Sequence, residues 1–296
     1  MIPGVDVSKW QGLMDWLECL DAGAKFAFIR AGSCNALTGQ CYEDYLFKEN
    51  SGYYEDHQGA PDLMPVGFYW YFRPNLNPTQ QADYFCNLIK DVDWRLSPVM
   101  DIETTGGLGQ AAVGDACAEF VTRVHEKLDV WPLIYTRGYF WNDRVAYRSI
   151  FDECDLWVAR YTSQPKPWGN AGDESKLAPN YWTDWTFWQY SADNNGRGAE
   201  FGATSKSIDL DYFNGDEAVF NEYVGCTVVD EPEWVKVTLW KGTVLRDIPA
   251  GECMTIVKEN EELRVIGKGV DDLGREWYQV ASGLWLASWY AERNEV

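Results

Sequence analysis

Histidine is scarce in this chain of 296 residues: there are only two, His57 and His125. No two of the eight cysteines have the C-x-x-C spacing, and no Gly-x-Ser-x-Gly sequence occurs. Zinc sites are usually built from closely spaced cysteines and histidines, and a Ser-His triad needs a histidine beside its nucleophile. We therefore predict no metal ion and no cofactor, and we expect any catalysis to rely on carboxylates.

Positive charge is also scarce, because 25 lysines and arginines face 46 aspartates and glutamates, for a net charge of −21. Binding to nucleic acid or to an anionic membrane needs a basic surface, so neither partner is expected. No apolar run reaches the roughly 20 residues of a membrane-spanning helix, so no membrane insertion is expected. Residues 1–6 lack the pattern of an export signal, so no signal peptide is predicted.

Aromatic residues, in contrast, are abundant and make up 16% of the chain, with 16 tryptophans and 17 tyrosines. Part of this excess is expected in the core. The other part would be explained by rings that stack on sugars at a binding site.

Two carboxylates stand out at the end of an apolar run. Val99, Met100 and Ile102 predict a buried strand, and Asp101 and Glu103 are two apart, so they share one face of it. In a parallel barrel, the C-terminal end of a strand lies at the active site. One of two close carboxylates then holds its proton to higher pH, as a general acid must. The alternative is a solvated strand end that caps the next helix.

The first three quarters of the chain predict an α/β fold, a TIM-like barrel whose helical ring is incomplete. Short strands alternate with helices at first and with loops later. The predicted strands are 4–8, 26–32, 65–72, the run around Asp101, 131–136, 155–161, 186–191 and 207–213, and the predicted helices are 16–22, 45–53, 78–90 and 112–128. Asp6 and Asp209 also lie on these strands, so a closed barrel would bring them to the same mouth as Asp101 and Glu103.

After residue 223 the pattern changes. Residues 1–223 are predicted to form the barrel domain, 224–234 a linker, and 235–296 a small all-β barrel domain. The short strands expected there are 235–237, 255–257, 263–266, 277–280 and 284–286.

Six ordered segments of the first domain resemble the lysozymes, or N-acetylmuramidases, of glycoside hydrolase family 25. They are residues 4–12 (GVDVSKWQG), 100–103 (MDIE), 133–136 (LIYT), 156–161 (LWVARY), 187–190 (FWQY) and 208–211 (IDLD). Residues 277–280 (WYQV) and 283–286 (GLWL) resemble, more weakly, a bacterial SH3-type cell-wall-binding domain.

The resemblance implies a barrel of β/α units closed by β-strands that cleaves the β-1,4 bond between N-acetylmuramic acid and N-acetylglucosamine in bacterial peptidoglycan. Glu103 would be the general acid, Asp101 would assist it, and Asp6 and Asp209 would be the other acids at the mouth. Where many members have asparagine, this chain has Asp211, which adds negative charge near the site or faces another layer.

In the expected mechanism, Asp101 is ionised and raises the pKa of Glu103 by repulsion. Attack by water and attack by the acetamido group of the substrate both remain open, and we favour the second. Other residues expected to contact substrate or to pair with the acids end predicted strands or lie on them: Tyr69, Tyr71, Tyr135, Trp188, Arg30 and Arg160. Each tyrosine and tryptophan has interior packing as its alternative, and each arginine a structural ion pair.

Three further expectations complete the prediction. Some aromatic residues of the small domain are expected to form a wall-binding face and the others to lie in its core: Trp240, Trp285, Trp289 and Tyr290. Cys34 and Cys41 lie in one loop and would form a disulfide in an oxidising compartment. The absence of a signal peptide favours a phage endolysin made in the host cytoplasm, and no oligomeric state is predicted. The competing functions are a non-catalytic protein that binds cell-wall glycan and a hydrolase of another N-acetylated glycan such as chitin.

Overall fold

The computed structural model describes residues 1–52, 59–161, 178–192, 196–225, 236–239, 243–246, 253–258, 261–270, 275–280, 283–288 and 291–294. The chain divides into two compact units, Met1–Cys226 and Thr227–Val296. No helix among the described residues is long and apolar enough to cross a membrane. Each unit is described below by itself.

The first unit is an eight-stranded barrel, with a ninth strand paired to its outer edge. Its sheet has the order β1-β9-β8-β7-β6-β5-β4-β2-β3, and an additional pairing of β1 with β2 closes the barrel. The strands are β1 (Ile2–Val7), β2 (Ala27–Cys34), β3 (Cys41–Glu43), β4 (Val66–Tyr71), β5 (Val99–Asp101), β6 (Leu133–Arg137), β7 (Leu156–Ala159), β8 (Phe187–Ser191) and β9 (Asp209–Phe213). All eight predicted strands are confirmed within a few residues, and β3 was not predicted.

The closing strand β9 is antiparallel to both of its neighbours, β1 and β8, while the other barrel strands run parallel. Its first residue, Asp209, lies opposite Asp6 near the end of β1. The start of β9 is therefore at the same mouth of the barrel as the C-terminal ends of the parallel strands.

Both faces of the barrel wall are apolar, which explains the continuous apolar runs in its strands. Inside the barrel, Phe26, Phe28, Trp157 and Phe187 pack as one cluster of rings. Outside, a larger core packs the strands against the helices. Because neither face is polar, alternation along the strands does not show which residues point inward.

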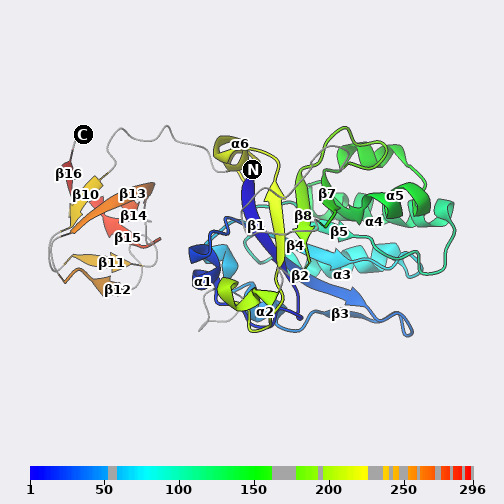
Figure 1. The fold of residues 1–296 in the computed structure, drawn as a ribbon, viewed down its shortest axis with the longest axis horizontal. Coiled ribbons are helices and arrows are strands. Elements are labelled where there is room, and N and C mark those ends of the chain that lie inside the picture. The colour runs from blue at the N-terminus through cyan, green and yellow to red at the C-terminus, as the bar shows by residue number, and fades with distance from the viewer. Residues whose placement is uncertain are drawn as a thin grey trace. The chain divides into compact units, whose positions relative to one another are not determined.

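The helices cover the barrel incompletely, as predicted. They are α1 (Trp16–Asp21), α2 (Phe47–Asn50), α3 (Pro78–Ile89), α4 (Gln110–Leu128), α5 (Gly138–Arg144) and α6 (Glu217–Tyr223), with 3-10 turns at Ala60–Asp62, Ser149–Glu153 and Gly198–Phe201. Figure 1 shows α3, α4 and α5 gathered on one side of the strands. The side chain of Asn77 caps α3 by accepting from the backbone N–H of Gln80 at 2.8 Å.

A disulfide joins Cys34 at the end of β2 to Cys41 at the start of β3, a pairing that the sequence left open. Four other cysteines, Cys19, Cys86, Cys117 and Cys154, are free and buried. Burial raises the thiol pKa of each of them, which makes them unreactive core residues.

The second unit is all β, with a seven-stranded sheet of order β12-β11-β15-β14-β13-β10-β16. Its strands are β10 (Lys236–Leu239), β11 (Val244–Arg246), β12 (Cys253–Ile256), β13 (Glu261–Val270), β14 (Glu276–Val280), β15 (Trp285–Ala287) and β16 (Ala291–Asn294). Leu239, Leu245, Tyr278 and Leu286 lie in its core. The sequence predicted five of these strands and missed the short β11 and β16.

Candidate active site

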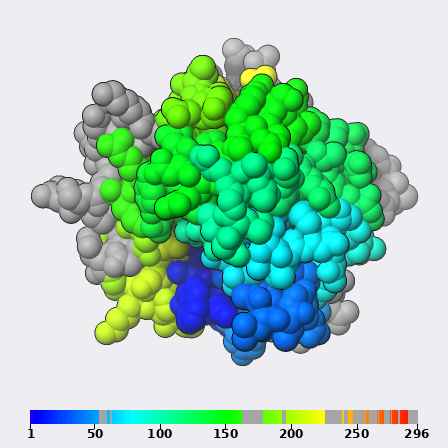
Figure 2. Space-filling view, turned by 90° about the vertical axis from the view of Figure 1, so that its right-hand side faces the viewer, coloured from blue at the N-terminus to red at the C-terminus, as the bar shows by residue number. Residues whose placement is uncertain are grey.

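The four acids singled out in the sequence meet at one mouth of the barrel. Asp6 is next to last on β1, Asp101 is last on β5, Glu103 follows two residues later, and Asp209 begins β9. The charge of Glu103 acts on both Asp6 and Asp101, and Asp6 and Asp101 also act on each other. In the space-filling view of Figure 2, segments from the dark blue N-terminal residues to the yellow-green residues past 200 lie side by side on one face.

Asp101 and Glu103 form an unequal pair. Asp101 is 3% exposed, whereas the side chain of Glu103 is 30% exposed and can be reached from outside. Burial raises the pKa of Asp101 well above its usual value, and the charge of Glu103 and a hydrogen bond to it raise it further. This differs from the expectation that Asp101 is the ionised partner, because the strand buries Asp101 more deeply than Glu103.

Asp6 is held by a polar chain that crosses the barrel. The Gln189 Nε2 on β8 donates to Asp6 Oδ2 at 2.6 Å, and the Tyr135 hydroxyl on β6 donates to Gln189 Oε1 at 2.7 Å. Burial raises the pKa of Asp6 to about 6, although the hydrogen bonds from Gln189 and Asp211 oppose the shift. Gln189 was not predicted as a site residue, and its signal in the sequence is a single amide among the apolar residues of a strand.

Asp211 faces the same interior as Gln189, its partner across β8 and β9. It is fully buried, and its Oδ1 accepts from the indole Nε1 of Trp157 at 2.8 Å. Because β9 runs antiparallel, Asp211 lies one layer deeper than Asp209. Of the two positions that the sequence allowed for Asp211, the structure therefore shows the one in the layer beneath the mouth.

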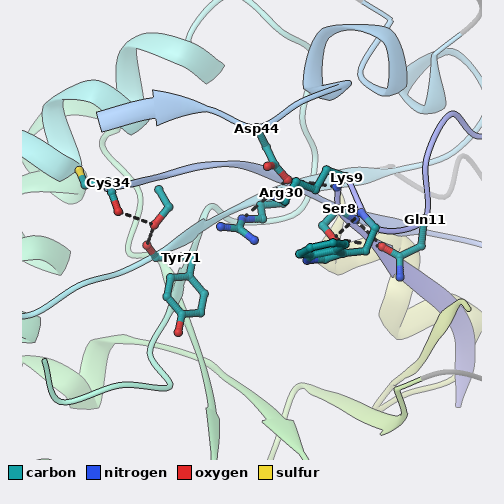
Figure 3. A network of polar contacts seen from close by, with 9 residues as sticks. Ser8, Lys9, Gln11, Arg30, Cys34, Asp44 and Tyr71 are labelled. Atoms are coloured by element: carbon teal, nitrogen blue, oxygen red, sulfur yellow. Dashed lines mark hydrogen bonds and ion pairs between the residues drawn. The ribbon is translucent and has the colours of Figure 1, made fainter. Parts of the chain in front are cut away.

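Arg30 lies beside the acids but pairs with a different carboxylate. Figure 3 shows its side chain between Asp44 and the ring of Tyr71. Its Nε is 3.7 Å from Asp44 Oδ2, and its guanidinium carbon is 5.2 Å from the centre of the Tyr71 ring. Both charged side chains are largely buried, and Asp44 also accepts from the backbone N–H of Lys9 at 3.1 Å. The charge of Arg30 still reaches Asp101, where it opposes the rise in pKa.

The structure separates the predicted aromatic residues. Tyr69 and Tyr135 are buried inside the barrel against Trp157, and Tyr71 is half-buried at the mouth. Burial raises the pKa of all three phenols, and the charges of the nearby acids, Asp101 among them, raise it further.

Trp188 does not belong to this group. It is 1% exposed in the outer core, on the opposite face of β8 from Gln189, and its Nε1 donates to the carbonyl of Arg160 at 2.8 Å. The prediction that its ring stacks on substrate is therefore wrong, because successive residues of a strand face opposite sides. Arg160 itself follows β7 and is exposed.

Arg137 is a site residue that the sequence analysis missed. It ends β6, and its Nη2 lies 3.9 Å from Glu103 Oε2. The same Nη2 donates a hydrogen bond to the phenol oxygen of Tyr161 at 3.2 Å. Its guanidinium also lies 5.1 Å from the centre of the Tyr161 ring. The available signal was its position two residues after Tyr135, which places both side chains on one face of the strand.

Within the part of the chain that the structure describes, no group of three or more acidic, histidine or cysteine side chains has the arrangement of a metal site. The acids at the mouth are held by the Gln189 amide, by one another and by the nearby arginines. Such an arrangement can transfer a proton and can stabilise developing positive charge.

Comparisons with known proteins agree with this geometry. The family model for glycosyl hydrolases family 25 matches residues 5–199. Lysozyme M1 of Streptomyces globisporus is 30% identical over 73% of this chain and 69% of its own length. Among solved structures, a bacterial lysozyme from Streptomyces coelicolor is 27% identical, with a TM-score of 0.58 over 76% of this chain and 96% of that one. A family 25 glycosyl hydrolase from Bacillus anthracis is 25% identical, with a TM-score of 0.59 over 75% of this chain and 93% of that one. The chain is therefore a glycoside hydrolase that belongs to family 25.

Proposed function

We propose that the chain is a muramidase that cleaves the β-1,4 bond between N-acetylmuramic acid and N-acetylglucosamine in bacterial peptidoglycan. Membership of family 25 and the similarity to Lysozyme M1 support the substrate class. The observation that carries the proposal is the meeting of Asp6, Asp101, Glu103 and Asp209 at one mouth of the barrel. Carboxylates in this arrangement suit glycosidic bond cleavage.

Glu103 is assigned as the proton donor because it is the exposed member of the pair. Its proton goes to the glycosidic oxygen, and the bond from that oxygen to C1 of the sugar breaks. The positive charge that develops on the ring is stabilised by the neighbouring carboxylates. Asp101, the more buried of the pair, orients the acetamido group of the substrate, whose carbonyl oxygen bonds to C1 and closes a five-membered ring. Water then attacks C1, breaks the bond to the acetamido oxygen and gives a proton to Glu103.

The test uses purified Gram-positive cell walls and compares the native chain with Glu103→Gln. We expect the native chain to release soluble fragments that end in reducing muramic acid, and the variant to release at least about a hundredfold less. Glu222→Gln is the matched control, because Glu222 is exposed on α6 and follows the far end of β9. Full activity of Glu103→Gln would overturn the assigned acid.

Two further outcomes of the same experiment separate the competing functions. Release of fragments from chitin but not from walls would point to another N-acetylated glycan. Walls that are bound and never cut would point to a non-catalytic binding protein. The anomer first released tests substrate assistance, because this route retains the configuration and clean inversion would contradict it.

We also propose that the parts of the chain have separate roles. Residues 1–223 carry out hydrolysis, residues 224–234 form a linker, and residues 235–296 form an SH3-type domain that binds the wall. The second unit has the all-β architecture that such a role needs. Trp285 is partly exposed there, while Trp240, Trp289 and Tyr290 lie outside the described residues. The proposed setting is a phage endolysin that acts on the host wall from within.

A further inference from the structure

Two carboxyl groups meet inside the barrel, just below the mouth. Asp6 is 4% exposed and Asp211 is fully buried, and their carboxyl groups lie within hydrogen-bonding reach of each other. A hydrogen bond between two carboxyl groups requires a proton on one of them, because an ionised carboxylate only accepts. The arrangement therefore fixes one proton between β1 and β9.

The surrounding donors show which of the two groups is ionised. Asp6 Oδ2 accepts the short hydrogen bond from Gln189 Nε2, and Tyr135 holds the other end of that amide. Asp211 Oδ1 accepts from Trp157 Nε1, but its buried Oδ2 has no N–H partner among the described residues. Asp211 Oδ2 is thus the atom that can carry the proton, with Asp6 as its acceptor.

Charge around the pair reinforces this assignment. Among the described residues, the titratable side chains that face Asp6 and Asp211 are acids or phenols: Asp101 at the end of β5, Glu103 after it, Asp209 on β9, Tyr69 on β4, Tyr135 on β6 and Tyr161 after β7. Within the described residues no lysine or arginine forms an ion pair with Asp6 or Asp211, and Arg30 and Arg137 pair with Asp44 and Glu103 instead. Two buried carboxylates in contact without a cation cannot both be ionised.

We propose that Asp211 is a positioning residue that stays protonated and donates a hydrogen bond to Asp6, which fixes Asp6 as the ionised acceptor at the mouth. Its link to catalysis rests on the proposed function, whereas its protonation does not. Burial raises the pKa of Asp211 well above its usual value, and the charge of Asp6 raises it further. The pKa of Asp6, at about 6, leaves that group ionised near neutral pH.

The first test compares Asp211→Leu with Asp211→Asn on cell walls. Asparagine can donate to Asp6 and accept from Trp157 as a protonated aspartate does, whereas leucine can do neither. We expect Asp211→Leu to lower kcat/KM by about tenfold or more, since a displaced acid loses its catalytic geometry. It should also move the acidic limb of the pH profile upward, because Asp6 loses a hydrogen bond that lowers its pKa. Asp211→Asn should restore kcat/KM to within about threefold of the native value.

The second test measures thermal stability and needs no activity. A folded-state pKa above the unfolded value stabilises the fold fully below the unfolded pKa, and this contribution is lost as pH rises towards the folded pKa. Asp211→Asn has no titrating group at this position and therefore does not lose this contribution. The difference in Tm, variant minus native chain, should increase between pH 5 and pH 8. Asp44→Asn is the matched control: Asp44 is equally buried but pairs with Arg30, so its loss should lower the Tm throughout this range.

Three results would overturn the proposal: an Asp211→Asn variant as inactive as Asp211→Leu, a Tm difference that does not increase with pH, or Asp44→Asn and Asp211→Asn behaving alike. If Asp211→Leu does not fold, the Tm series of Asp211→Asn decides alone. If the native chain cuts no wall, the proposed function fails, while the Tm series still tests the proton on Asp211.

Discussion

Single residues at the mouth make the stability of this protein depend on pH. Burial raises the pKa of Asp6 to about 6 and the pKa of Asp101 well above its usual value. Because both folded-state values lie above the unfolded ones, the protonated groups stabilise the fold at low pH, and this contribution falls as pH rises through about 4 to 6 and beyond. For Asp6 the loss is about 3 kcal/mol.

We therefore expect the Tm of the native chain to fall between pH 5 and pH 7.5, as measured by circular dichroism. The net charge of −21 acts in the same direction, so Asp101→Asn is needed for comparison. That variant should show a shallower fall, because it lacks one of the raised carboxyls. A Tm that rises over this interval would contradict the assigned shifts.

Arg137 gives a second prediction at this scale. It lies 3.9 Å from Glu103 and holds Tyr161 by a hydrogen bond and a ring contact. Arg137→Ala should lower kcat/KM by about tenfold, or about 1.4 kcal/mol, since both the cation and the position of Tyr161 are lost. The kcat/KM of Arg137→Lys should lie between those of the native chain and Arg137→Ala, because lysine keeps the charge but lacks the planar donor group. Arg148→Ala, which removes an ion pair with Asp115 on α4, should leave the rate unchanged.

At the scale of elements, the local sequence determines the start of α3. Asn77 caps its first turn and Pro78 occupies its first position. Asn77→Ala should lower the free energy of unfolding by about 1 kcal/mol, and Asn77→Asp should retain most of it, because aspartate also accepts from the turn. Urea denaturation measures both variants. No loss of stability in Asn77→Ala would show that the side-chain cap contributes nothing.

The same scale shows what could be read from the sequence. Long apolar runs predicted the barrel strands, but β3, with three residues, is too short to show alternation, and α5 and α6 were also not predicted. The acids of the site were found because charged side chains are conspicuous in apolar strands. Trp188 was misplaced because both faces of β8 are apolar, so that only the neighbouring Gln189 marks the inner face. Protonation depends on burial, which the sequence does not give for Asp101 or Asp211.

For the whole molecule, two separate cores predict two separable functions. The barrel packs around its own clusters, and the second unit has another centred on Tyr278 and Leu286. A chain ending at residue 226 should fold and cleave soluble glycan fragments at the native rate. When insoluble walls are sedimented, the shortened chain should remain in the supernatant. The full-length Glu103→Gln variant should instead sediment with the walls. Equal binding by the shortened chain would contradict the proposed role of the second unit.

Closure of the barrel by β9 has a consequence for synthesis. Asp6 leaves the ribosome well before Gln189, Asp209 and Asp211, which lie near the C-terminal end of the first unit. A nascent chain that stops before β9 has an open sheet edge beside β1 and lacks two of the carboxyls around Asp6. Unfinished chains therefore carry no assembled site. The cell that makes a wall-degrading enzyme of this design is exposed only to completed copies.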